Sequence, residues 1–408
     1  MLLLTCLLVA HSVSAAVGGN TPNPLGDLKP LPRRSPEMQA FDKAILYLMS
    51  QQEEDGHWSA EKSGASPEFR TINGDITLTA LAAATMLDAC SYKQQNPKAM
   101  AAAKKAMQWL TARIRADGGI ADETAGGEPV TAQIFAALTL LQAADLSARQ
   151  TLHDNAAKVC RHAALSMQRK DGGFGATPGD PAVRADLTAL ALVMFNQARG
   201  SDVTFGDAPV KGPVEQETLR KIENSIRAGL KALSSDPKNK GILAFSSDKL
   251  EANWDGTMDG LLIEAALQIQ GAEADAGLTY VLGVEYSADN QETIKSFPGF
   301  EQHVKWGEKG EGYAALTLLE GSMMFYNVYG PQQLAYNAWS KAVLDLILTH
   351  QSPDGSWDAA GFDARLGRFW RTGLQARILL LLAPPPMPMP PPPPDPPGPN
   401  NAGGPDGK

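Results

Sequence analysis

The sequence has 408 residues, 43% of them hydrophobic, and carries a formal net charge of −9. A chain of this length can bury a large core, and length alone predicts two or three domains unless internal repeats join it into one. Binding to DNA or RNA requires Lys and Arg side chains that neutralise phosphates. With 45 acidic against 36 basic residues and no basic run, the composition argues against a nucleic-acid partner.

The first 36 residues read as two segments that precede the folded part. Residues 1–15 are an apolar run ending in Val13-Ser14-Ala15, which is typical of a signal-peptide cleavage site, although the usual positive residue near the start is missing. The run is too short for a membrane-spanning helix. Residues 16–36 are rich in Gly, Pro and Asn and form a flexible leader. We therefore expect a secreted or periplasmic protein.

The stretch from Lys43 to Trp58 introduces the unit from which the rest of the chain is built. Its first half has apolar residues at the 3, 4 and 7 spacing of an amphipathic helix. Its second half contains Asp55-Gly56, a tight turn in which glycine can adopt positive φ, and Trp58, whose ring can cover the turn. The pattern predicts a helix, a turn and an aromatic anchor.

This unit recurs along the chain. The turn aspartate returns at Asp117, Asp171 and Asp354, which gives a period of roughly 60 residues, and each turn is followed by a helix of small and apolar residues. The fourth repeat (helix 216–233) and the fifth (helix 273–284, then a loop with Trp306) are degenerate. Neither the first nor the last repeat has a polar cap, so a closed ring is favoured. The sequence predicts an all-α fold, an α/α toroid of about six helix pairs over residues 37–383, with the apolar helices in the inner ring.

Residues 384–408 differ from everything before them. They are dominated by proline up to Pro399 and then by Gly and Asn, a composition typical of an extended polyproline II segment. We expect a disordered tail; the alternatives are a spacer or a ligand for a protein partner. No apolar segment follows that could anchor the chain in a membrane.

The repeat unit resembles the QW repeat of squalene and oxidosqualene cyclases. In the first copy, Lys43-Ala44, Tyr47-Leu48 and the Gln-x-x-x-Gly-x-Trp stretch match at every specified position. The glutamine, glycine and aromatic positions are Gln52, Gly56 and Trp58, then Gln168, Gly172 and Phe174, then Gln351, Gly355 and Trp357. This is similar to the terpenoid cyclase and protein prenyltransferase superfamily, and most similar to secreted bacterial prenyltransferase/squalene oxidase repeat proteins of unassigned role. The resemblance implies that these residues link neighbouring helix ends.

The acid motif of the family cyclases, Asp-x-Asp-Asp-Thr-Ala, is incomplete here. The stretch from Asp75 has Thr77 at the position of the catalytic acid. The stretch around Asp186 keeps the middle aspartate without its acidic neighbours. Asp186 is therefore a candidate catalytic acid, and the competing interpretation, which also applies to Asp75, is a helix N-cap.

The zinc ligands of the prenyltransferases are also missing. Cys90 and Cys160 have no histidine at ligand spacing, and neither lies in the Gly-Cys-Gly-Glu-Gln stretch of the thioester proteins that share the toroid. We expect no metal and no cofactor. The two cysteines are expected to be core residues, with a disulfide as the alternative in an exported protein.

Two further carboxylates, Glu264 and Glu320, lie in apolar stretches assigned to the inner ring. A buried carboxylate must be paired or neutral. Either Arg371 or Arg377 neutralises them, or they face the central cavity as an acid and base pair, as in α/α-barrel glycosidases. Because both catalytic motifs of the family are incomplete, we expect a non-catalytic binding or scaffold toroid that holds a small apolar or glycan ligand. The alternative is a terpene-cyclase-like or polysaccharide-acting enzyme that uses Asp186, Glu264 and Glu320.

Overall fold

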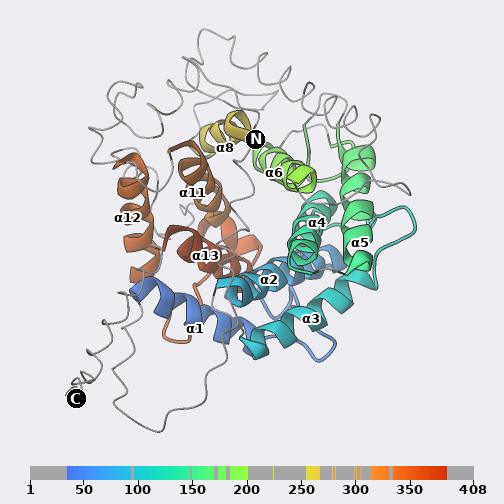
Figure 1. Ribbon diagram of the computed structural model, residues 1–408, viewed down its shortest axis with the longest axis horizontal. Coiled ribbons are helices and arrows are strands. Elements are labelled where there is room, and N and C mark those ends of the chain that lie inside the picture. Colours follow the sequence, from blue (N-terminus) through green and yellow to red (C-terminus); the bar gives the residue numbers. More distant parts are fainter. Residues whose placement is uncertain are drawn as a thin grey trace, which may run out of the picture.

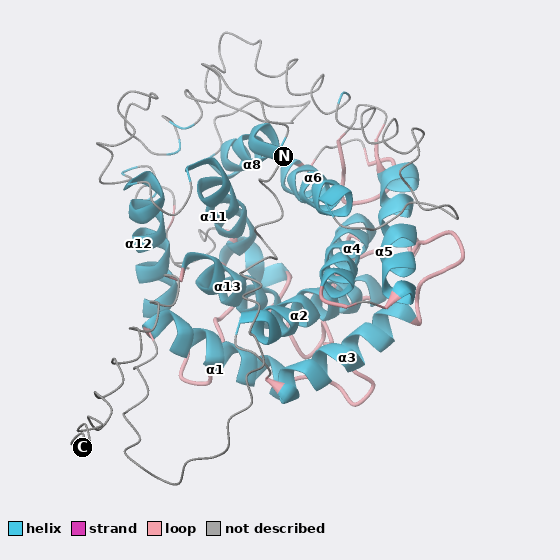
Figure 2. Cartoon of the chain, in the orientation of Figure 1, coloured by secondary structure: helices cyan, strands magenta, loops and turns pink. Residues whose placement is uncertain are grey.

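The computed structural model describes residues 35–92, 96–147, 149–169, 173–180, 184–200, 254–266, 314–329 and 334–383, with a few isolated positions between 224 and 304. Within these ranges the regular structure is helical throughout and contains no strand (Figure 2). The expected signal peptide, most of the leader, the helices at 216–233 and 273–284, Trp306 and the tail lie outside the described residues. The described elements are α1 (Pro36–Ser50), α2 (Ile72–Tyr92), α3 (Pro97–Thr111), α4 (Pro129–Asp145), α5 (Gln150–His162), the π-helical turn η2 (Ala163–Met167), α6 (Ala185–Gly200), α8 (Trp254–Ala266), α11 (Ala315–Tyr329), α12 (Leu334–Thr349), the 3₁₀ turn η5 (Gly361–Arg365) and α13 (Arg368–Leu382).

The described helices form two concentric rings (Figure 1). In the inner ring α2 packs on α4, α4 on α6, α6 on α8, α8 on α11 and α11 on α13, and α13 packs back on α2 and closes the ring. Outside it, α1 covers α13, α3 covers α2, α5 covers α4 and α12 covers α11. The predicted α/α toroid is confirmed.

Side-chain composition explains which helices go inside. The inner helix α4 is buried from Pro129 to Ala137 without a break, since its residues are small or apolar on every side. The outer helix α5 buries only one stripe, which includes Ala156, Val159 and Cys160, and exposes the rest. A helix that is apolar all round is stable only when it is covered on all sides, and an amphipathic helix can cover it.

The first turn is held by the residues of the repeated pattern. Gln52 Nε2 donates to Gly56 O, across the turn, and to Ala102 O of α3, both at 2.9 Å. Trp58 is fully buried, and its Nε1 donates to Leu48 O at the end of α1 at 2.8 Å. Gly56 has φ +102°, and a Cβ there would lie 2.7 Å from a backbone oxygen of α3. The turn therefore ties α1 to the next outer helix.

The last repeat makes the same contacts and joins the two ends of the ring. Gln351 Nε2 donates to Gly355 O at 3.0 Å and to Ala40 O of α1 at 2.8 Å. Trp357 Nε1 donates to Ile347 O at 2.8 Å. The contact between Gln351 and Ala40 spans 311 residues of sequence, so the toroid closes by the same bond that links consecutive repeats.

In the third repeat, Phe174 is described and fully buried, whereas Gly172 lies outside the described residues. The backbone N–H of Phe174 donates to Thr188 Oγ1 of the following inner helix at 3.0 Å. Trp58 and Trp357 donate in the same way to the hydroxyls of Thr79 and Thr372, at 3.0 and 3.2 Å. A threonine on α2, on α6 and on α13 thus fixes the aromatic anchor of the turn before it.

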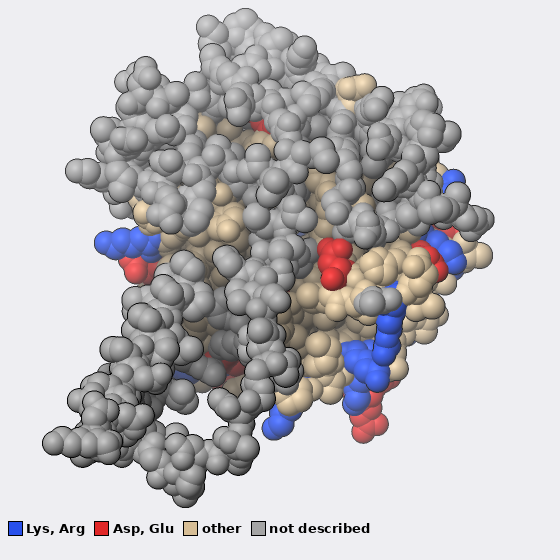
Figure 3. Space-filling view, viewed as in Figure 1, with Lys and Arg blue, Asp and Glu red and all other residues tan. Residues whose placement is uncertain are grey.

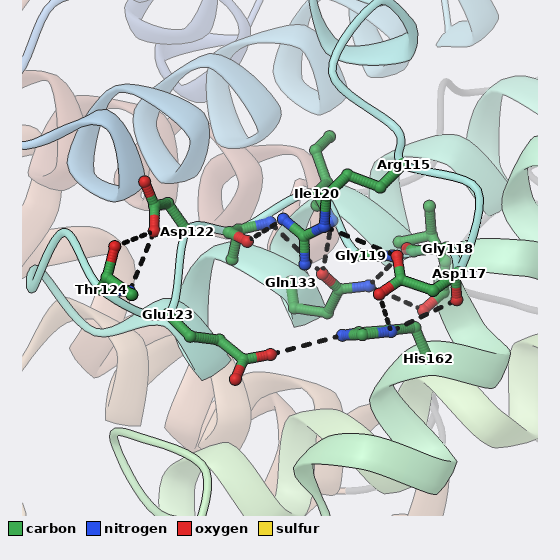
Figure 4. A network of polar contacts seen from close by, with 12 residues as sticks. Arg115, Asp117, Gly118, Gly119, Ile120, Asp122, Glu123, Thr124, Gln133 and His162 are labelled. Carbon is green, nitrogen blue, oxygen red and sulfur yellow. Dashed lines mark hydrogen bonds and ion pairs between the residues drawn. The ribbon is translucent and has the colours of Figure 1, made fainter.

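The second repeat lacks the turn glutamine and replaces it from the inner ring. Ile114 occupies the glutamine position, and Gln133 of α4 reaches back into the turn (Figure 4). Gln133 Nε2 donates to Gly118 O at 3.1 Å and to Val159 O of α5 at 2.9 Å, the counterparts of the two acceptors of Gln52. Its Oε1 accepts the backbone N–H of Ile120 at 2.9 Å, as a threonine hydroxyl does for the aromatic anchor in the first, third and last repeats. One buried side chain therefore performs two tasks that are separate elsewhere.

Candidate active site

The described inner helices α2, α4, α6 and α13 each follow a described outer helix, α1, α3, α5 and α12, and their N-terminal ends lie on one side of the ring. Charged contacts connect the starts of α4, α6 and α13: Arg184 Nη1, just before α6, donates to Glu128 Oε1, just before α4, at 3.2 Å. Arg365, shortly before α13, also binds Glu128.

Asp186 is the second residue of α6 and is bound by Arg184. Arg184 Nε donates to Asp186 Oδ1 at 2.8 Å, and Arg184 Nη2 donates to Oδ2. Such two-point binding fixes the plane of a carboxylate. The N-cap interpretation therefore does not describe Asp186, which lies inside the first turn and takes its hydrogen bonds from a side chain.

Asp255, the second residue of α8, is a neighbour of Asp186 that the sequence did not single out. Burial, followed by the negative charge of Asp186, raises the pKa of Asp255 to about 6. Asp255 remains partly exposed. A carboxyl with this pKa can release and take up a proton near neutral pH, which is the requirement for a general acid or base.

Asp259 and Glu320 form a buried pair between α8 and α11. Each is the sixth residue of its helix, so the two lie at the same height on neighbouring parallel helices. Asp259 is 6% exposed and Glu320 is fully buried, and burial raises the pKa of both carboxyls well above their usual values. The Glu320 oxygens receive no hydrogen bond from an N–H or O–H donor of the described residues.

The two carboxyls are close enough to act on each other, and either could donate a hydrogen bond to the other when it carries a proton. Two carboxylates cannot bond to each other, so a hydrogen bond between Asp259 and Glu320 requires a proton on one of them. Asp186 acts on both members through its charge, and Arg184 partly opposes it. The site therefore combines the buried Asp259–Glu320 pair, the partly exposed Asp255 and the bound Asp186 carboxylate.

The structure brings Asp186 and Glu320 into this group, but the expected pairing of Glu320 with an arginine of α13 is wrong. Arg371 Nε lies 3.8 Å from Asp363, and Arg377 Nε lies 3.0 Å from Asp88. Glu264 is buried on α8, five residues beyond Asp259, which is about 7.5 Å further along the helix axis. The carboxyls that act most strongly on Glu320 are Asp259 and Asp186, so Glu264 is not its principal partner.

Asp75 does not start its helix either. α2 begins at Ile72, and the Asp75 carboxylate accepts the backbone N–H of Ala60 at 2.7 Å. Burial raises the pKa of Asp75, and the bond from Ala60 opposes this. Asp75 therefore fastens the loop that leads from the first turn to α2.

The far end of the inner ring holds a separate charged cluster. Asp88 is buried near the end of α2, where Arg377 pairs with it and Gln142 Nε2 donates to its Oδ1 at 2.5 Å. These contacts link α2, α4 and α13 and stabilise the packing of the three helices.

Cys90 and Cys160 are free thiols. Within the described ranges, no group of three or more His, Cys, Asp or Glu side chains has a geometry that could hold a metal ion. No described helix is both long enough and apolar enough to cross a membrane. On the face shown in Figure 3, the described charged side chains form small separate groups amid uncharged surface.

The residues that the sequence interpretation missed carry weak signals. Asp255 and Asp259 are four residues apart at the start of an apolar helix, a spacing that places two carboxylates on one helix face. Glu128 stands between Gly127 and Pro129 and reads as a loop residue. Arg184 stands where the cyclase acid motif has its first aspartate, and nothing in that position predicts an ion pair with Glu128. Their roles become visible only when the helix starts are side by side.

Comparison with known proteins supports the fold. The family model described as A-macroglobulin TED domain matches residues 32–158, under a third of the chain. Among solved structures, the α-1,6-mannanase GH76A of Salegentibacter sp. HEL1_6 matches at 12% identity, covering 85% of this chain and 99% of the mannanase, with a TM-score of 0.53. An inactive variant of it in complex with α-1,6-mannotetrose matches at 11% identity over 85% and 98%, with a TM-score of 0.55.

The type II terpene cyclase MstE from Scytonema matches at 14% identity over 85% of this chain and 97% of the cyclase, with a TM-score of 0.47. No curated protein matches the sequence. At these identities, the likeness to the mannanase shows a shared α/α toroid fold.

Proposed function

We propose that this protein is an enzyme that uses carboxyl acid–base chemistry at the N-terminal side of the inner ring, and that its substrate is a neutral glycan. The observation that carries the proposal is the group of four carboxyls on α6, α8 and α11, in which Asp259 and Glu320 are buried together and burial raises the pKa of both. A ring that served only as a scaffold would gain stability from apolar residues at positions 259 and 320, since burying two carboxyls next to each other is costly.

Each carboxyl has a role that follows from its surroundings. Asp255 is partly exposed and has a pKa of about 6, so it is the group that donates a proton to the oxygen of the bond that breaks. Asp186, bound at two points by Arg184, stabilises the positive charge that develops on the sugar ring and accepts the proton of the attacking water. The Asp259–Glu320 pair is buried beside them, and burial raises the pKa of both of its carboxyls. Hydrolysis consumes one water and leaves Asp255 ionised and Asp186 protonated; transfer of that proton from Asp186 to Asp255 through solvent then regenerates the acid.

A neutral substrate follows from the charge at the site. The negative charge of Asp186 acts on Asp255, and Asp186 and Asp255 both act on Asp259; such carboxyls repel phosphates and uronic acids. A polyene cyclase guides its carbocations with aromatic faces, whereas the aromatic side chains here pack against one another, which favours a glycan over an isoprenoid. Trp254 and Phe300 pack against Trp339 of α12. Phe135 and Trp370 pack against each other with ring centroids 5.1 Å apart. The mannanases with the same fold bind or cleave a neutral glycan, which agrees with this choice.

A non-catalytic binding or scaffold toroid is the second candidate. The observation in its favour is the threonine at position 77, which occupies the acid position of the cyclase motif, together with the two-point binding of Asp186 by Arg184. The QW-like turns support a common origin with the terpenoid cyclase superfamily under either candidate. We also propose that residues 1–15 direct export and that the proline-rich tail can bind a protein partner.

The two candidates are separated by one experiment. The purified protein is incubated with panels of neutral oligosaccharides and of isoprenoids, and products and bound species are identified by mass spectrometry. We expect cleavage of a neutral glycan, with the rate lowered at least about 100-fold in Asp255→Asn and in Asp186→Asn. The matched control is Asp358→Asn, whose carboxyl is 71% exposed and binds Arg368 at the outer surface.

The outcomes differ clearly. Glycan that is bound but unchanged, with equal affinity in Asp255→Asn and the wild type, would contradict catalysis and favour the scaffold. Conversion of an isoprenoid would contradict the glycan and leave the acid–base site in place.

A further inference from the structure

Glu128 is placed in an unusual backbone conformation at the start of α4. It has φ +57°, and it is the one residue other than glycine with positive φ among the described residues. The two residues before it, Gly126 and Gly127, have φ +72° and +67°. Side chains with a Cβ rarely adopt this region, and a glutamate has none of the local hydrogen bonding that lets Asn or Asp do so. A glycine at position 128 would satisfy the backbone, so the glutamate side chain must have its own reason to be there.

The side chain of Glu128 lies between two arginines from distant parts of the chain. Its carboxylate, only 13% exposed, accepts from Arg184 Nη1 at 3.2 Å and from Arg365. Its second oxygen accepts from Thr131 Oγ1 at 2.9 Å. Burial works to raise the pKa of Glu128, but the two guanidinium groups outweigh it and the net pKa is lowered. Glu128 is therefore ionised and neutralises one of the two arginine charges.

Through Arg184 the contact continues to the acidic group, the four carboxyls on α6, α8 and α11 that form the proposed site. Arg184 holds Asp186, and both act on Asp259 and Glu320. The sequence Arg365, Glu128, Arg184, Asp186 forms a strut of alternating charge with no net charge, which runs from the start of α13 past α4 to α6. With Glu128 removed, two cations would face each other and the positive charge beside the acidic group would no longer be balanced.

We infer that Glu128 is a positioning residue that holds Arg184 against Asp186 and keeps the strut neutral, so that the acidic group beyond it retains its proton. This inference rests on the proposed function for its purpose, but its test needs no substrate. Loss of a negative charge lowers the pKa of nearby carboxyls, because their ionised form meets less repulsion. Loss of a positive charge raises it.

The test is a titration of the carboxyl groups by ¹³C NMR on the full chain with labelled Asp and Glu side chains. In Glu128→Gln, we expect the midpoints of Asp255 and of the Asp259–Glu320 pair to fall by about 0.5 to 1 pH unit, since a charge in direct contact shifts a pKa by 1–3 units and this one acts through Arg184. In Arg365→Gln, we expect the same midpoints to rise. The matched control is Glu123→Gln in the same loop, whose carboxylate is 44% exposed and lies 3.7 Å from His162 instead of the strut; its midpoints should stay at the wild-type values.

Midpoints in folded Glu128→Gln that stay within about 0.2 unit of the wild type would overturn the inference. If Glu128→Gln does not fold, Arg365→Gln decides alone, and unchanged or lowered midpoints there would also overturn it. Absence of any turnover with shifted midpoints would refute the proposed function and leave the strut intact. The two conclusions can therefore fail separately.

Discussion

Gln133 offers a sharp test of how the repeats are joined, because one buried side chain replaces the turn glutamine and the anchoring threonine. In Gln133→Met the side chain keeps its length and loses its polar atoms, so little cavity is created. The Ile120 N–H and the Gly118 carbonyl then lose the partners that they have at 2.9 and 3.1 Å. The Val159 carbonyl is affected less, since it also accepts the backbone N–H of Ala163.

Each buried polar group left without a partner costs about 1–3 kcal/mol, so two such groups predict a loss of about 3 kcal/mol in the free energy of unfolding. The assay is urea unfolding, followed in parallel by circular dichroism and tryptophan fluorescence. The matched control is Gln150→Met on α5, where the exposed amide bonds only to exposed Asp154; its change should stay within about 0.5 kcal/mol. A loss below about 1 kcal/mol in Gln133→Met, with an unchanged denaturant slope, would refute the role assigned to this glutamine.

Three further perturbations have expected outcomes. Gly118→Ala should lower the free energy of unfolding by more than about 2 kcal/mol, because Gly118 has φ +85° and a Cβ there would lie 2.1 Å from a carbonyl oxygen of α5. The control Gly64→Ala, with φ +75° and open space around it, should lower it by about 1 kcal/mol. Equal losses in thermal or urea unfolding would contradict the close approach at Gly118. Burial raises the pKa of Asp363 to about 6, so the folded state binds the Asp363 proton more tightly than the unfolded chain does. The free energy of unfolding should therefore fall by about 3 kcal/mol as the pH rises from 4 to 6. Unfolding measured from pH 4 to 7 should show this slope in the wild type and not in Asp363→Asn. Arg377→Met should destabilise by about 3 kcal/mol because it leaves Asp88 buried without its cation, and Asp88→Asn in the same chain should restore part of the loss; no recovery in the double variant would contradict the pairing.

The sequence was sufficient for the ring because its signal is periodic. The Gln-x-x-x-Gly-x-Trp pattern from Gln52 to Trp58 predicts a turn contact, and the structure shows that contact in the first and last repeats. Helix starts were harder to predict. The α2 helix begins at Ile72 although Asn73 and Gly74 are poor helix formers, because the Asn73 side chain donates to Asp122 O at 2.7 Å and ties the helix to the next loop.

The candidate site could be predicted only in part, because its contacts depend on where each helix starts. Asp186 stood out by comparison with the cyclase acid motif and Glu320 as a carboxyl in an apolar helix, and both belong to the group of carboxyls on α6, α8 and α11. Asp259 could not be matched to Glu320 before the starts of α8 and α11 were known, since the equal height of the two residues depends on those starts. Glu128 was missed because its function depends on Arg184 and Arg365, which lie 56 and 237 residues away in the sequence.

The most direct test of the acid–base site is infrared spectroscopy of the purified protein at pH 8. Asp255, with a pKa of about 6, is ionised there, whereas the shared proton of Asp259 and Glu320 should remain. We predict the C=O stretch of a buried carboxylic acid in the wild type and in Asp358→Asn, and its loss in the double variant Asp259→Asn with Glu320→Gln. An identical carboxylic-acid band in the wild type and the double variant, or no such band in either, would show that the pair holds no proton and would contradict the site.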